Sequence, residues 1–298
     1  MNKTSVPSPV TSAGTTRPRA IRASSAALLL VLLTGLASAH DTWFEAKTQK
    51  RSGRIVMALG TGNQFPVLEF PLALAALHSS GCRQGAQTMA LKGMTATPKF
   101  TLMQTEAKAQ NGISGISGPA EAISCWAQSV PFDIEIPADK VSLYFDEINP
   151  PQATRDRWAA LQARGLPWLE RYVKHARIEF SNPVLLAEPT PAQAPATPSG
   201  MGMDLLIQSG LQPLRSGDAL VFQVLRDAAP LADFAVELRG VTTQAGQERW
   251  LRTDAQGMVR TTAPAAGRWL LRGTDLRASA ENPDQWDSRF ITLAFDVY

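Results

Sequence analysis

The sequence predicts a mainly β protein with two β-sandwich domains and a short helical insertion in the first. Three observations predict this class. Short runs rich in β-branched and aromatic residues recur, and Gly, Pro, Asn or Asp bounds each of them. A single clear helical pattern interrupts these runs in the first half. A Pro/Ala-rich stretch at 187–200 then divides the chain into two parts of ordinary domain size.

Residues 1–39 have the pattern of a secretory signal peptide. Four basic residues and no acidic residue precede an apolar run at 26–36, and Ala37, Ser38 and Ala39 supply the small residues of a cleavage site. The apolar run is too short to span a bilayer. We therefore expect a periplasmic or secreted protein that begins at His40 and has no transmembrane segment.

Cleavage would change the net charge of the protein. The whole chain has 29 Lys and Arg against 26 Asp and Glu, but all four charged residues of the signal are basic. The mature chain then has 25 basic and 26 acidic residues, a net charge of −1. A chain without a basic excess lacks the electrostatic attraction that dominates nucleic-acid affinity. We expect no nucleic-acid partner.

The first domain, 40–186, is expected to be rich in β-strands. One helix is expected at 154–163, where Trp158 and Leu161 share a face and Gly165 follows the end. An apolar run that ends at His78 is helix-like, and the second half of 168–180 alternates as strands do. The other predicted strands are short runs at 54–59, 100–103, 132–136 and 141–145.

The segment 187–200 has four prolines and no large apolar residue, which predicts an exposed linker. The second domain, 201–298, should be an immunoglobulin-like or transthyretin-like sandwich because its strands follow one another at short intervals with turn signals between them. No catalytic motif of the common hydrolase or phosphate-binding types occurs, so we expect no enzyme. The expected strands are 219–225, 234–238, 248–252, 258–260, 267–272 and 290–297.

The only cysteines are Cys82 and Cys125. Export places them where disulfides persist, so one structural bridge is the expected state. A thiolate metal pair or redox pair is the rival hypothesis. That hypothesis is weaker, because the two residues lack Cys-x-x-Cys spacing and have no histidine nearby.

His40, as the first residue of the mature protein, would offer two nitrogens to a metal. Its α-amine and imidazole Nδ1 can close one chelate ring, and the α-amine has a reference pKa of roughly 7.7 to 8.0. Loss of its proton therefore costs little near neutral pH, and metal binding favours that loss. The alternative is that signal cleavage leaves a histidine first by chance.

His175 is expected on a strand, with Lys174 and Ala176 on the opposite side. If it faces the N-terminus, His40 and His175 together supply three nitrogens, which suits copper, nickel or cobalt. Otherwise it is a surface histidine between basic residues. We assign His78 a structural role, and Met201 and Met203 could be soft copper ligands or core residues.

The segments that carry a resemblance to a known family are Ala39-His40-Asp41-Thr42-Trp43, 171–177, 214–220, 229–232, 253–257, 267–269 and 286–295. They are similar to a bacterial exported family of unknown function, sometimes described as the nickel-uptake substrate-specific region. The resemblance covers nearly the whole mature chain and implies an envelope protein with a divalent-metal theme, found beside cobalt and nickel uptake systems. His40 and Asp41 match the start of that family, which implies Asp41 as a possible oxygen ligand beside His40, whereas His175 aligns only loosely.

The leading hypothesis is a non-enzymatic periplasmic protein that binds nickel, cobalt or copper, with His40, Asp41 and His175 as ligands, and presents it to a membrane metal-uptake transporter. The first alternative is an envelope adhesion or carbohydrate-binding module without metal, since β-sandwiches often serve that purpose. A further alternative is an oxidative copper enzyme with an N-terminal histidine brace. Oxygen consumption with a reductant separates that enzyme from a binding protein.

Overall fold

A computed structural model of the chain describes Met1 and residues 40–48, 55–84, 87–105, 122–181, 197–210, 214–241 and 249–298. Residues 2–39, which include nearly all of the predicted signal peptide, lie outside the described residues, as does 187–196 of the predicted linker. The chain divides into the units Met1–Gly35 and Leu36–Tyr298, and every described residue except Met1 belongs to the second. In the described residues, no helix is long and apolar enough to cross a membrane.

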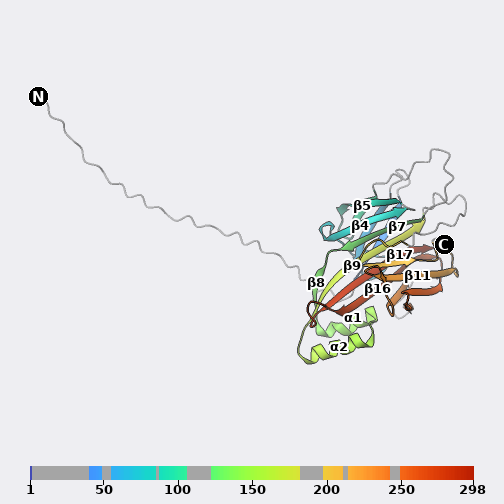
Figure 1. Cartoon of the computed structure of the whole chain (residues 1–298). Coiled ribbons are helices and arrows are strands. Elements are labelled where there is room, and N and C mark those ends of the chain that lie inside the picture. The colour runs from blue at the N-terminus through green and yellow to red at the C-terminus, as the bar shows by residue number, and fades with distance from the viewer. Residues whose placement is uncertain are drawn as a thin grey trace, which may run out of the picture. The chain divides into compact units, whose positions relative to one another are not determined.

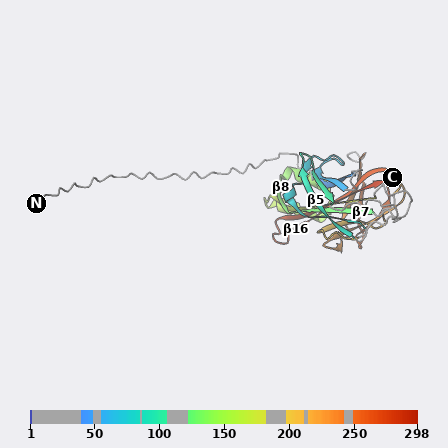
Figure 2. The same ribbon diagram turned by 90° about the horizontal axis from the view of Figure 1, so that it is seen from above.

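The second unit contains two largely antiparallel sheets and two helices, seen from two directions in Figure 1 and Figure 2. The larger sheet has 13 strands in the order β1-β2-β6-β5-β4-β7-β9-β17-β16-β13-β14, with β3 beside β2 and β8 beside β9. Its strands are β1 (Asp41–Thr48), β2 (Ile55–Gly62), β3 (Phe70–Pro71), β4 (Leu77–Gln84), β5 (Gln87–Ala96), β6 (Thr101–Thr105), β7 (Ala122–Ser129), β8 (Phe132–Ile136), β9 (Trp168–Ser181), β13 (Ala235–Gly240), β14 (Arg249–Arg252), β16 (Gly267–Ala278) and β17 (Trp286–Val297).

The smaller sheet has four strands, in the order β10-β11-β12 with β15 also paired to β11. Buried and more exposed side chains alternate along most of β11, as in a half-buried strand, whereas β10 is buried throughout. Leu220, Phe222 and Val224 of β11 are fully buried, and Ile291, Leu293 and Phe295 of β17 belong to the same apolar cluster. The strands are β10 (Met203–Ile207), β11 (Ala219–Arg226), β12 (Ala229–Pro230) and β15 (Met258–Thr262).

The two predicted domains share the larger sheet. Strand β9 from the first runs parallel to β17 from the second, in register from Glu170 opposite Trp286 to Ile178 opposite Ala294. Trp126 of β7 packs into the apolar cluster of the second part, and Leu270 of β16 packs into the cluster of the first. The predicted boundary at 187–200 therefore does not divide the sheet, although each part contributes most of one apolar cluster.

Two helices lie side by side next to one end of β9 and β16 in Figure 1. They are α1 (Val141–Ile148) and α2 (Gln152–Ala163), with short 3-10 turns at Leu74–Ala76 and Ala138–Lys140. Trp158 of α2 packs edge-on against Trp168 of β9, which in turn stacks on Trp286 of β17 at 4.7 Å. The aromatic contacts fix the helices to the sheet.

The mainly β, sandwich-like class with a helical insertion is confirmed, and α2 confirms the predicted helix at 154–163. The strand predicted at 141–145 is wrong, because α1 occupies it. Its buried side chains, Val141, Tyr144, Phe145 and Ile148, recur at helical spacing, whereas Leu143, which a strand would have buried, is 43% exposed. The helix-like run before His78 is also wrong, since His78 lies in β4, exposed to solvent.

Candidate functional site at the predicted mature N-terminus

Strand β1 fixes the position of His40, the residue immediately before it. The strand pairs with β2 along its whole length, from Asp41 opposite Gly62 to Thr48 opposite Ile55. Two side chains also hold the backbone from across the sheet. Lys174 Nζ donates to the carbonyl oxygen of His40 at 2.8 Å, and Thr292 Oγ1 donates to that of Thr42 at 2.6 Å. The start of the predicted mature chain is therefore tied down on two sides.

The imidazole of His40 lies at the surface between a carboxylate and an aromatic ring. Its Nε2 is 4.0 Å from Oε2 of Glu69, and its ring meets that of Phe70 edge-on at 5.8 Å between centroids. The side chains of His40 and Glu69 are 28% and 33% exposed. Because Nε2 is the nitrogen that faces Glu69, Nδ1 is directed to another side of the ring.

Asp41 is held in a buried ionic cluster and faces away from the surface. Its Oδ2 accepts a 3.0 Å hydrogen bond from Arg272, which also donates to Glu237 and to the carbonyl oxygen of Glu147. Burial opposes the charge of Arg272, but the two carboxylates outweigh it and hold the pKa of that guanidinium above its usual value. Asp41 can therefore serve as a metal ligand only if this pair breaks, which is costly.

Lys174 also contributes to this site, although the sequence did not predict it. Burial lowers the pKa of its ammonium to about 8, against the opposing attraction of Asp41. Its Nζ also lies 5.7 Å from the centre of the Tyr172 ring. This ammonium is the hydrogen-bond donor to the carbonyl oxygen of His40. The only available signal was its place between the strand residues Val173 and His175.

His175 lies on the other face of β9 from Lys174, because neighbouring residues of a strand point to opposite faces. It is 1% exposed, and its Nδ1 hydrogen-bonds to the carbonyl oxygen of Phe290 at 2.9 Å. Burial lowers its pKa to about 4. The strand and the alternation predicted for His175 agree with the structure, but the structure does not bring His175 to His40.

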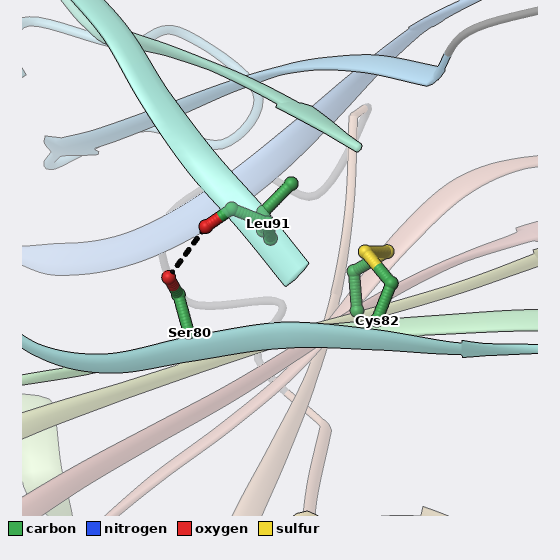
Figure 3. The surroundings of a disulfide bond; sticks show 4 residues. Ser80, Cys82 and Leu91 are labelled. Carbon is green, nitrogen blue, oxygen red and sulfur yellow. Dashed lines mark hydrogen bonds between the residues drawn. A yellow bond between two sulfur atoms is a disulfide. The ribbon is translucent and has the colours of Figure 1, made fainter. Parts of the chain in front are cut away.

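The predicted disulfide is confirmed. Cys82 of β4 and Cys125 of β7 lie opposite each other in register and are joined, with both side chains fully buried. Figure 3 shows the bridge beside the hydrogen bond from Ser80 to the carbonyl oxygen of Leu91, which links β4 to β5 on its other edge. The bridge lies in the apolar core of the first part of the chain. Because the two sulfurs are bonded to each other, neither cysteine has a free thiolate that could bind a metal.

Side chains alone do not form a metal cage in the described part of the chain. Among those residues, no three His, Cys, Asp or Glu side chains come together in a way that could hold an ion. Met201 and Met203 pack in the apolar cluster beneath β10 and β11, which favours their role as core residues. A metal at His40 would therefore depend on the α-amine.

A separate hollow of about 250 Å³ lies between the turn that joins α1 to α2 and one end of β16. Leu231, Phe234 and Leu276 provide apolar lining, while Asp233 and Arg277 contribute charged groups. None of the predicted ligands lines this hollow.

The model of the family described as "Domain of unknown function (DUF4198)" matches residues 37–274, which is most of the chain. No curated protein is significantly similar to it in sequence. Among solved structures it is similar to one described as "D0-D1 domain of Intimin", at 9% identity over 86% of this chain and 98% of that chain, with a TM-score of 0.20. A likeness this distant says nothing about function.

Proposed function

The chain belongs to the DUF4198 family, and we propose that it is a periplasmic protein that binds a divalent transition metal at its mature N-terminus. The proposal begins with cleavage after Ala39, which frees the α-amine of His40. The family model begins at residue 37, so the matched region starts close to this cleavage site. The metal is nickel or cobalt, with copper the third candidate, and it is cargo for a membrane uptake system.

The observation that carries the proposal is the orientation of His40. A chelate by the α-amine and Nδ1 leaves Nε2 free, and Nε2 is the nitrogen that lies near Glu69. Histidines that bind metals commonly donate their other ring N–H to a carboxylate, which fixes the ring and makes it a better ligand. Glu69 is suitably placed for that role.

The ligand set is smaller than the sequence predicts. His40 contributes two nitrogens. Asp41 is engaged in its salt bridge with Arg272, and His175 lies on the other face of β9, where it hydrogen-bonds to Phe290. Two nitrogens at a half-exposed position leave several coordination sites to water. Such a site suits reversible binding and transfer, which is what delivery of a metal requires.

Calorimetric titration of the processed protein with Ni²⁺, Co²⁺ and Cu²⁺ tests this function. The expected result is binding that His40→Ala weakens at least tenfold and that Glu69→Gln weakens by about tenfold, as outer carboxylates do. His78→Ala is the matched control, because His78 is an exposed histidine on the same sheet, and it should leave the affinity unchanged.

Two outcomes would contradict the proposal. Intact mass of periplasmic protein that places the first residue after His40 removes the chelate altogether. Absence of binding for all three ions favours the adhesion or carbohydrate-binding module, for which the hollow beside the α1–α2 turn is the place to look. Oxygen consumption by the copper-loaded protein with a reductant would instead favour the copper enzyme.

A further inference from the structure

Strand β9 directs three buried ionisable side chains to one face. His175, Arg177 and Glu179 alternate along the strand, so they share a face, and each is 1% exposed. Residues 197–204, here called the latch segment, cover this face and lead into β10. Arg177 donates to Oδ1 of Asp204 at 2.9 Å and to the carbonyl oxygen of Thr197 at 3.4 Å.

Further hydrogen bonds hold the latch segment in place. Asp204 Oδ2 accepts from the backbone N–H of Ser199 at 2.7 Å and from its hydroxyl at 2.9 Å. Arg83 of β4 donates to the carbonyl oxygen of Pro198, and the N–H of Gly202 donates to Gln128 of β7 at 2.9 Å. The oxygens of Asp204 are therefore fully used.

Glu179 differs from Asp204 because only one of its oxygens has a partner among the described residues. Oε1 accepts from Nε of Arg177 at 2.9 Å, while the buried Oε2 has no partner within the described ranges. Directly opposite on β7 lies Ser124, whose buried hydroxyl also has none in this part of the chain. Side chains that face each other across two strands lie within reach of one another. Two unsatisfied polar groups are thus neighbours beneath the latch segment.

The buried charges beneath the latch segment do not balance if both carboxyl groups are ionised. Glu179 and Asp204 share one buried guanidinium, that of Arg177, while Arg83 of β4, which lies opposite Ser124, donates to Pro198 in a hydrogen bond that is exposed to solvent. A calcium or magnesium ion needs about six oxygen ligands or more, and only two are free here. A proton on Oε2 removes the excess charge. No hydrogen bond joins Oε2 to the Ser124 hydroxyl in the structure, and a rotation of either side chain lets the protonated oxygen donate to it.

We propose that Glu179 is a carboxylic acid that donates to Ser124 in the folded protein, and that loss of this proton loosens the latch segment. Protonated Glu179 leaves a neutral Arg177–Asp204 pair to hold residues 197–204. Ionised Glu179 competes with Asp204 for the same guanidinium and leaves a buried carboxylate oxygen without a partner. The fold thus contains a pH-sensitive fastening between β9 and the strand β10 of the smaller sheet.

The electrostatic surroundings support this assignment. Burial raises the pKa of Glu179 to about 7; Arg177 opposes the shift and Asp204 adds to it. A folded-state pKa above the value of 4.5 for a free glutamate means that the folded state holds the proton more tightly. The stabilisation is therefore complete below about pH 4.5 and is lost as the pH rises through about 7.

Hydrogen exchange in the whole protein tests the proposal. After correction for the intrinsic exchange rate, protection of the Ser199 and Gly202 amides should fall about tenfold or more between about pH 5.5 and pH 8.5. In Glu179→Gln, whose amide imitates the neutral acid, protection should no longer fall as the pH rises, and only the opposite effect of His175, which favours the folded state above about pH 6.5, should remain. Glu135→Gln, at an exposed glutamate of β8, is the matched control and should behave as the wild type.

Equal pH dependence in the wild type and in Glu179→Gln would overturn the proposal. Infrared spectroscopy provides a test should that variant fail to fold. The wild type should show the carbonyl band of a protonated carboxylic acid near neutral pH, and Ser124→Ala should shift its frequency because the acid loses its acceptor. A wild-type spectrum without this band, or a band that Ser124→Ala leaves in place, would equally refute it.

Discussion

The ammonium of Lys174 donates to the backbone carbonyl of His40 at 2.8 Å, across 134 residues of sequence. Lys174 lies in β9, at the centre of the larger sheet, whereas His40 precedes β1 at one end of the strand order. The contact is made by backbone at His40 and leaves its imidazole free to face Glu69. The central strand thus helps to hold the start of the predicted mature chain in place.

Replacement of Lys174 by methionine should loosen this start without unfolding the protein. Methionine keeps the apolar stem and removes a cation that burial disfavours, so the free energy of global unfolding should change little. A hydrogen bond to a charged group contributes about 1.5 kcal/mol, which is roughly tenfold in an opening equilibrium. Hydrogen exchange of the Thr42 and Trp43 amides should therefore quicken about tenfold. Lys140→Met, at an exposed lysine that pairs with Asp139, should leave these rates unchanged.

The buried pair between Arg272 and Asp41 should matter far more to stability. Arg272→Met leaves Asp41 as a buried carboxylate without its salt-bridge partner and removes one of the two arginines that pair with Glu237, and breaking a buried pair in this way typically costs about 3–5 kcal/mol. Arg171→Met is the control, because Arg171 pairs with Asp133 at the surface, where a salt bridge contributes about 1 kcal/mol at most. Denaturant unfolding of both variants measures the difference. Equal losses would show that the Arg272 cluster is not the internal support described here.

The disulfide should be complete in exported protein. Alkylation of the denatured, unreduced chain should label neither Cys82 nor Cys125, and replacement of both by alanine should lower the free energy of unfolding by about 2–4 kcal/mol. Labelling of both cysteines at full occupancy would restore the thiolate hypothesis.

His175 should make the protein less stable in acid. Its folded-state pKa of about 4 lies below the ordinary value of 6.5, so the unfolded chain binds the proton first. Stability is then lost as the pH falls from about 6.5 to about 4, by about 3 kcal/mol at most. His175→Asn keeps a donor for Phe290 and should remove this loss, whereas His78→Asn should not. Thermal unfolding across this pH range compares the two.

The local patterns of the sequence predicted the β class, helix α2 and the disulfide, because alternation, helix-ending residues and cysteine pairing are local or compositional signals. The error at 141–145 also has a local cause. Val141, Leu143 and Phe145 alternate as in a strand, and only Tyr144 and Ile148 complete the helical face. A short apolar run can contain residues two apart, as in a strand, and residues three or four apart, as in a helix, so this pattern alone does not distinguish the two.

The candidate site could be predicted only in part. His40 follows from the cleavage pattern, but its neighbours Glu69 and Lys174 reach it through strand pairing over long stretches of chain. Asp41 was predicted to be a ligand because it matches the start of the similar family, and its actual partner Arg272 lies 231 residues away. The parallel pairing of β9 with β17, which joins the two parts of the chain in one sheet, likewise has no local signal.

Metal binding as proposed requires the free amine of His40 as a ligand, and two matched proteins can show whether it is one. One protein begins at His40 with a free α-amine, and the other has the same sequence with that amine acetylated, so that only the amine differs. Calorimetry with Cu²⁺ and Ni²⁺ should give an affinity for the first that exceeds that of the second well over tenfold, since one of two chelating nitrogens is lost. Equal affinities would show that the metal, if bound, is held elsewhere.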